Sequence, residues 1–309
     1  MSQQHIKIEG RGAPTLQPAL CVGGVSLALT GDSGASLRFA DELQAFCVKT
    51  AHIDIDVNVR WKERLPVAAG SVAFDSGALW TLFHDCGDFV FDFSSRALGN
   101  NPYKRLRIDF GFRQAQLTLS LEVLGSYSDV SPLEYPADEL LFTNYLAANG
   151  LGVEVHGCGL VDAETGGHLL LGHSGAGKST TARLWQSLRN PEILSDDRII
   201  LRIENGELWM YGTPWHGEGC FAFPNKAKLD RILILQHGDR NHLTEMSRAH
   251  AAAELFARSF PPFHSSEGLQ NVMDFLNRVV NLVPCYEFHF VPDASAVNTV
   301  IEMKHAAVA

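Results

Sequence analysis

The sequence lacks the features that mark several classes of protein. None of its six cysteines stands in a C-x-x-C pair, and no secretory signal opens the chain. No apolar run is long enough to span a bilayer, and neither an internal repeat nor a low-complexity tract occurs. We therefore expect a globular, cytoplasmic protein whose thiols are reduced.

Basic charge is also scarce. The chain has 25 Lys and Arg against 35 Asp and Glu, which gives a formal net charge of −10 at pH 7. This balance argues against nucleic acid or an anionic membrane as the main partner, although it allows a local basic pocket for ATP. The length of 309 residues suits one large or two ordinary domains.

One stretch carries a specific chemical signal. Residues 168–181 read HLLLGHSGAGKSTT, and within them 172–179 spell G-x-x-x-x-G-K-S, the phosphate-binding loop or Walker A pattern. Gly175 and Gly177 allow backbone conformations that a Cβ would resist. The N–H groups of the loop can then point inward and form a nest for phosphate oxygens.

The remaining positions of the motif predict how ATP and Mg²⁺ bind. Lys178 can reach the β- and γ-phosphates, and Ser179 can offer its hydroxyl to Mg²⁺. The apolar run 169–171 predicts a buried strand, and 179–188 predicts a helix whose N-terminus faces the phosphates. The predicted nucleotide-binding residues are Gly172, Ser174, Gly175, Ala176, Gly177, Lys178, Ser179 and Thr180.

The N-terminal part is dominated by patterns typical of strands. Apolar and polar residues alternate over 52–61, 105–112 and 115–123. Residues 79–84 and 88–93 predict a hairpin across Asp-Cys-Gly. We therefore predict a mainly antiparallel β (α+β) domain over 1–134, which is a candidate for docking a substrate or partner.

Residues 135–309 are predicted to form an α/β domain that carries the phosphate loop. An amphipathic helix is expected over 137–148, then a strand over 152–156 that ends in a turn through Gly157 and Gly159. A hairpin is expected over Asn205-Gly206. Further strands are expected at 192–194, 231–236 and 286–291, and helices at 248–259, 267–282 and 294–303.

Three segments together resemble the HPr kinase/phosphorylase family, whose nucleotide core is related to that of ATP-dependent phosphoenolpyruvate carboxykinase. They are H-G at 156–157, GHSGAGKS at 172–179 and S-D-D at 195–197. The chain is also similar to a branch of bacterial HPr-kinase-like proteins. The segments of that second resemblance are D-E-L-L at 138–141, G-T-P-W at 212–215, S-F-P-P at 259–262 and V-P-C-Y-E at 283–287.

The resemblance implies a role for each matching residue. Asp196 would be the base that takes a proton from the attacking hydroxyl, His156 would hydrogen-bond Asp196, and Lys178 would hold the phosphates. The residues implied on the metal side are Ser179, Asp197 and Glu218. The expected function is ATP-dependent phosphoryl transfer to a hydroxyl, most simply a Ser of a peptide or protein.

Other functions stay open at this point. His173 occupies a position where the family usually has Asp, which argues against a phosphorylase reaction. The family's docking pattern for HPr is not evident, so HPr is not expected as the substrate. A small-molecule kinase for an amino acid or sugar, a non-catalytic ATP-binding regulatory module and a carboxykinase-like enzyme are the alternatives. The oligomeric state is not predicted.

Overall fold

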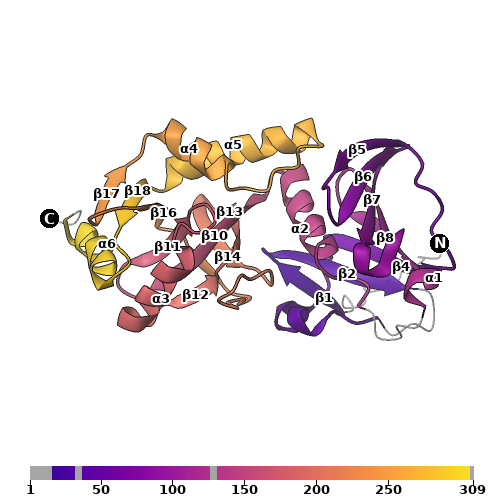
Figure 1. Ribbon diagram of the computed structural model, residues 1–309, viewed down its shortest axis with the longest axis horizontal. Coiled ribbons are helices and arrows are strands. Elements are labelled where there is room, and N and C mark those ends of the chain that lie inside the picture. Colours follow the sequence, from indigo (N-terminus) through magenta and orange to yellow (C-terminus); the bar gives the residue numbers. More distant parts are fainter. Residues whose placement is uncertain (1–15, 32–36, 126–130, 307–309) are drawn as a thin grey trace, which may run out of the picture.

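The computed structural model describes residues 16–31, 37–125 and 131–306, and it shows two large β-sheets (Figure 1). Within these ranges no helix combines the length and the apolarity needed to cross a bilayer. All six cysteines are free.

The first sheet has the strand order β3-β1-β2-β4-β9-β8-β7-β6-β5. It is mainly antiparallel, as expected, but β4 pairs in parallel with both β2 and β9. Its strands are β1 Gln17–Val22, β2 Val25–Gly31, β3 Cys47–Thr50, β4 Ile55–Lys62, β5 Ser71–Asp75, β6 Trp80–Asp85, β7 Asp88–Ser95, β8 Gly99–Asp109 and β9 Gln114–Ser120. Three short helices accompany them: η1 Asp41–Phe46, η2 Arg96–Leu98 and α1 Leu121–Leu124.

The hairpin between β6 and β7 is confirmed. Its turn residues Cys86 and Gly87 both have positive φ, 51° and 92°, as a tight two-residue turn requires.

The strand expected over 105–112 is too long, because β8 ends at Asp109. The Asp109 carboxylate accepts hydrogen bonds from the backbone N–H groups of Gly111 and Arg113, at 3.0 and 2.8 Å. These bonds favour a turn, in which Phe112 adopts a φ of 56°. The alternating apolar pattern continues through this turn, which is why it resembled a strand.

The second sheet has the order β15-β14-β13-β10-β11-β16-β18-β17, with β12 paired to β10. Strands β11, β16 and β18 run parallel to one another. The strands are β10 Gly152–Asp162, β11 Gly166–Leu171, β12 Glu192–Ser195, β13 Arg198–Glu204, β14 Glu207–Gly212, β15 Lys226–Lys228, β16 Arg231–His237, β17 His242–Glu245 and β18 Cys285–Phe290. Of these, β15 and β17 were not predicted.

The predicted turn at Gly157 and Gly159 is wrong, because β10 runs on without interruption to Asp162. A Cβ on Gly157 would lie 2.7 Å from a methyl carbon of Leu171, and one on Gly159 would lie 2.7 Å from a methyl carbon of Ile199. These glycines therefore allow close packing inside the sheet.

Helices cover both faces of the second sheet, as Figure 1 shows. Helices α4 and α5 pack on one face, and α3 and α6 pack on the other. Their bounds are α3 Lys178–Arg189, α4 Arg248–Phe256, α5 Ser266–Leu282 and α6 Ala294–Ala306. The hairpin over Asn205-Gly206 is confirmed, with both residues at positive φ.

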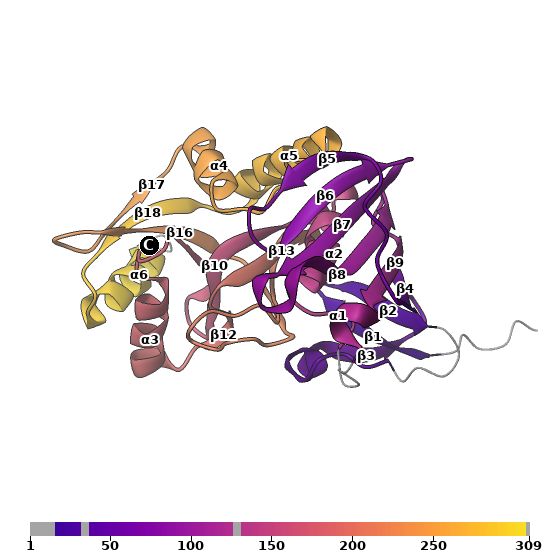
Figure 2. The same cartoon turned by 45° about the vertical axis from the view of Figure 1, so that its right-hand side comes forward.

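Helix α2, Ala137–Ala148, has the predicted bounds but is not amphipathic. Leu141, Phe142, Tyr145 and Leu146 are all buried, and residues from several sides of the helix contact apolar neighbours. The helix lies between the two sheets (Figures 1 and 2). Its core also includes Ile200 and Tyr211 from the second sheet and Trp215 from the loop after β14. Because both sides are covered, none of the residues of α2 is fully exposed to solvent, including the polar ones.

Candidate phosphate-binding loop and acidic pair

The phosphate loop connects β11 to α3. Gly175 and Gly177 have φ values of 81° and 100°, in the left-handed region that favours glycine. A Cβ on Gly177 would lie 2.4 Å from the Phe290 ring, so this position needs glycine for space as well. The loop is also closed by a hydrogen bond of 3.0 Å from the Ala176 N–H to the His173 carbonyl.

Lys178 is only 8% exposed at the first turn of α3. Its ammonium donates to the carbonyls of Gly172 and His173, at 3.0 and 3.4 Å. Burial lowers the pKa of Lys178, and the charge of Asp197 acts in the opposite direction. A buried cation held by carbonyl groups of its own loop suits an anion such as a phosphate group.

Two aromatic residues support the loop and were missed by the sequence analysis. His237, at the end of β16, places its Nε2 3.0 Å from the Gly175 carbonyl. Its ring stacks on Phe290, at the end of β18, with the centroids 5.9 Å apart. Because β11, β16 and β18 are parallel, their carboxyl ends share one edge of the sheet. The position of His237 and Phe290 at the carboxyl ends of predicted strands was therefore the signal that could have identified them.

Asp196 is 3% exposed and both its oxygens accept backbone hydrogen bonds. The N–H of Gly217 donates to Oδ1 at 2.9 Å, and the N–H of Gly219 donates to Oδ2 at 2.6 Å. Asp196 therefore holds the loop 213–225 against the end of β12.

The predicted partner of His156 is corrected by the structure: His156 contacts Asp197 rather than Asp196. The distance from His156 Nε2 to Asp197 Oδ1 is 3.1 Å, and the Arg198 guanidinium contacts the other oxygen of Asp197. Burial would raise the pKa of Asp197, but the bond from His156 and the charge of Arg198 together lower that pKa below its usual value. Asp197 thus remains ionised, and its side chain is 28% exposed.

The His156–Asp197 pair lies between two openings. One, of 380 Å³, is lined by His156 together with Gly172 and His173 of the phosphate loop. The other, of 550 Å³, is lined by Asp197 and by residues of α2 and of the loop after β14. The pair therefore connects the surface beside the phosphate loop to a second surface between the sheets.

The structure shows where the remaining predicted metal ligands lie, but it does not bring them together into a metal site. Ser179 is half-buried in the first turn of α3, and Glu218 is exposed on the loop that Asp196 holds. Within the part of the chain that the structure describes, no group of three or more His, Cys, Asp or Glu side chains is arranged to hold a metal ion. A magnesium site formed by Ser179, Asp197 and Glu218 therefore remains a prediction. Ser174 is exposed on the loop, and Thr180 is exposed in the first turn of α3.

Comparisons with known proteins add little to this geometry. No protein-family model matches the chain, and no curated protein matches it in sequence. Its structure has a likeness to the HPr(Ser) kinase/phosphatase from Coxiella burnetii, with 13% sequence identity and a TM-score of 0.30. The likeness covers 50% of this chain and 92% of that one.

Proposed function

We propose that the chain binds ATP at residues 172–180 and transfers its γ-phosphoryl group to a hydroxyl, a Ser of a peptide or protein. The observation that carries the proposal is that His156, the partner of Asp197, lines one opening with Gly172 and His173 of the phosphate loop. A carboxylate held by a histidine beside a phosphate loop is suited to receive the proton of an acceptor hydroxyl.

Each residue has a defined part in this proposal. Lys178 and the loop N–H groups bind the phosphates, and Asp197 orients the acceptor hydroxyl and takes its proton. His156 fixes the direction of the Asp197 carboxylate. The lowered pKa makes Asp197 a weak base, which is acceptable because phosphoryl transfer depends more on positioning than on proton abstraction. Mg²⁺, which Ser179 and Glu218 would hold together with the phosphates, would neutralise phosphate charge, and Asp197 is left to act as the base.

This assignment moves the base from Asp196 to its neighbour. Both oxygens of Asp196 are engaged by the backbone of Gly217 and Gly219. A carboxylate in that position is suited to hold a loop. The oxygens of Asp197 also have partners, His156 and Arg198, but its side chain is 28% exposed, whereas Asp196 is 3% exposed.

The proposal is tested by incubating the protein with Mg²⁺ and γ-labelled ATP, with and without a bacterial lysate. Wild type is compared with Lys178→Ala and Asp197→Asn. We expect label on a discrete acceptor, recovered as phosphoserine, and its loss in both variants. Label on a small molecule would contradict the protein acceptor, and failure to bind ATP would contradict the phosphate loop itself.

The alternative of a non-catalytic ATP-binding module is favoured by one observation. Half of the acidic pair, Asp196, is turned toward the loop backbone and not toward the phosphate loop. In that case ATP binds to wild type and to Asp197→Asn equally well, and no label moves in either sample.

A further inference from the structure

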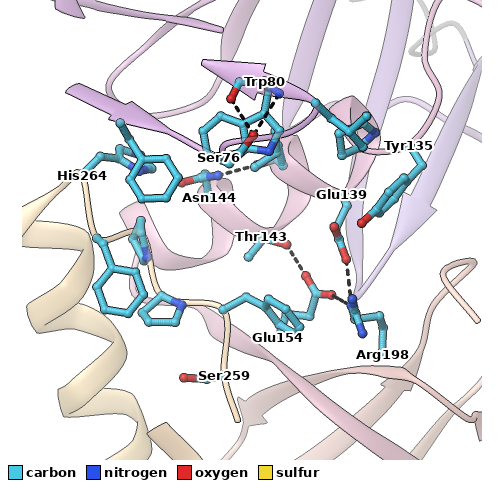
Figure 3. A pocket seen from close by; sticks show the side chains of 18 of the residues that line it. Ser76, Trp80, Tyr135, Glu139, Thr143, Asn144, Glu154, Arg198, Ser259 and His264 are labelled. Carbon is cyan, nitrogen blue, oxygen red and sulfur yellow. Dashed lines mark hydrogen bonds and ion pairs between the residues drawn. The ribbon is translucent and has the colours of Figure 1, made fainter. Parts of the chain in front are cut away.

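A cavity between the two sheets carries an inference of its own. Its volume is 410 Å³, within the range that is typical of small-molecule pockets. Figure 3 shows that segments far apart in the sequence wall it. They are the β5–β6 hairpin, the first turns of α2, Glu154 of β10, Arg198 of β13 and the segment 259–264 between α4 and α5.

The rim of the cavity is apolar and uncovered. Four large side chains that line it are well exposed: Phe74 by 37%, Leu79 by 42%, Tyr135 by 54% and Phe263 by 65%. Trp80 stacks on Phe74 with the ring centroids 5.2 Å apart, which makes one wall a flat aromatic surface. Apolar side chains gathered at the mouth of a pocket are typical of a ligand site.

The floor of the cavity holds two buried acceptors that lack a hydrogen bond. Asn144 is 4% exposed and Glu154 is 1% exposed. Among the described residues, no donor makes a hydrogen bond to Asn144 Oδ1 or to Glu154 Oε1, although Arg198 Nε lies 3.3 Å from the latter. Buried acceptors are costly without a donor, so a ligand that brings one would be stabilised here.

The floor is also short of positive charge. Arg198 contacts three carboxylates, those of Glu139 at 2.9 Å, Glu154 at 3.3 Å and Asp197. It is the one Lys or Arg among the described residues that line the cavity. His264 adds no charge at pH 7, because burial lowers its pKa to about 4. Burial and the neighbouring Glu139 raise the pKa of Glu154 well above its usual value, as expected where a second cation is lacking.

We propose that this cavity binds a small amphipathic amine. Its apolar body lies against Trp80, Phe260 and Phe263, and its protonated head faces Glu139, Glu154 and Asn144. The head supplies both the N–H donors and the positive charge that the floor lacks. The aromatic walls favour a cationic group further, since the faces of aromatic rings attract cations. A ligand with a carboxylate head would meet the charge of Glu139 instead.

The test uses three probes that share a phenyl ring and a short chain but differ in the head group. Phenethylamine is cationic, phenethyl alcohol is neutral and hydrocinnamate is anionic. Binding of each to the full-length protein is measured by calorimetry at pH 7. We expect the amine to bind most tightly and the acid not at all. Failure of the amine to bind, or equal binding of all three, would overturn the proposal.

Variants locate the binding in the cavity. Glu139→Gln should weaken amine binding by about tenfold, because a carboxylate partner of the head is neutralised. Phe263→Ala should weaken all binding, and the exposure of this side chain makes misfolding no concern. Glu204→Gln is the matched control, since Glu204 pairs with Lys226 outside the cavity. Equal binding by Glu139→Gln, Phe263→Ala and wild type would contradict the site.

Amine binding in the cavity is independent of the proposed phosphoryl transfer. Lys178→Ala should bind the amine as wild type does, even though its binding of ATP is impaired. Loss of amine binding in Lys178→Ala would place the amine at the phosphate loop and overturn the cavity site.

Discussion

The phosphate loop and the cavity of Figure 3 are built from opposite kinds of polar group. The loop is one short segment, 172–179, that offers backbone N–H groups and one buried ammonium. The cavity collects side chains from distant segments, and its floor is formed by carboxylates. A site made of backbone is suited to an anion, and a site with surplus carboxylates is suited to a cation.

Arg198 lies where the two regions meet. Its guanidinium contacts Glu139 and Glu154 on the cavity side and Asp197 on the side of the phosphate loop. The ring of Phe260 also packs against it, 4.4 Å from the guanidinium carbon. The positive charge of Arg198 thus offsets carboxylates of both regions, so both regions should respond when Arg198 is replaced.

The largest effect is therefore expected from removal of Arg198. Arg198→Met leaves three carboxylates without their cation, and we expect it to lower the free energy of unfolding by about 3–5 kcal/mol. Urea denaturation measures this loss. Arg60→Met, at an exposed position on β4, is the control and should cost less than about 0.5 kcal/mol. Equal costs for both variants would show that Arg198 does not hold the two regions together.

The next largest effect is a dependence of the free energy of unfolding on pH. It comes from Asp138 at the start of α2, the helix that lies between the two sheets. Burial raises the pKa of Asp138 to about 6 from 3.8, although the Trp215 indole N–H donates to it at 3.0 Å. The folded state therefore holds a proton that the unfolded state releases. Its stabilising contribution is present below pH 4 and is lost as the pH rises through 6, by up to about 3 kcal/mol.

The Asp138 effect is isolated by a difference measurement. Urea denaturation of wild type and Asp138→Asn at pH 4 and pH 7 should show that wild type loses more stability on going to pH 7 than the variant does. The same pH dependence in both proteins would mean that Asp138 does not titrate in this range.

A smaller effect separates two glycines of the phosphate loop. Both Gly175 and Gly177 have positive φ, so alanine at either position costs about 1–2 kcal/mol. Only at Gly177 does a Cβ also meet the Phe290 ring, which adds about 1–3 kcal/mol. Thermal or urea unfolding should therefore show that Gly177→Ala is less stable than Gly175→Ala. The reverse order would mean that Phe290 does not pack under the loop.

These regions also differ in how far the sequence alone could predict them. The phosphate loop was predicted because its requirements are local: glycine where φ is positive, and a lysine at the start of a helix. The cavity was not predicted, because Trp80, Glu139, Glu154 and Phe263 are brought together only by the packing of the two sheets on α2. No short pattern in the sequence records that packing.

The acidic pair falls between these cases. The sequence predicted a strand at 192–194 shortly before Asp196 and Asp197, and in the structure β12 ends at Ser195, next to them. The resemblance implied that His156 pairs with Asp196, but the structure pairs it with Asp197. Neighbouring residues at a strand end point in different directions, so the sequence alone does not decide between them. Gly157 and Gly159 were misread for a related reason, because glycine serves close packing as well as turns.

The most direct test of the account compares Asp196→Asn with Asp197→Asn. We expect Asp197→Asn to fold and bind ATP but to lose about 10²–10⁴ in the rate of phosphoryl transfer. Asp196→Asn should instead lose about 1–3 kcal/mol of stability, because one backbone N–H of Gly217 or Gly219 is left without an acceptor. Transfer by Asp197→Asn at the wild-type rate, with activity lost only in a stably folded Asp196→Asn, would contradict the account.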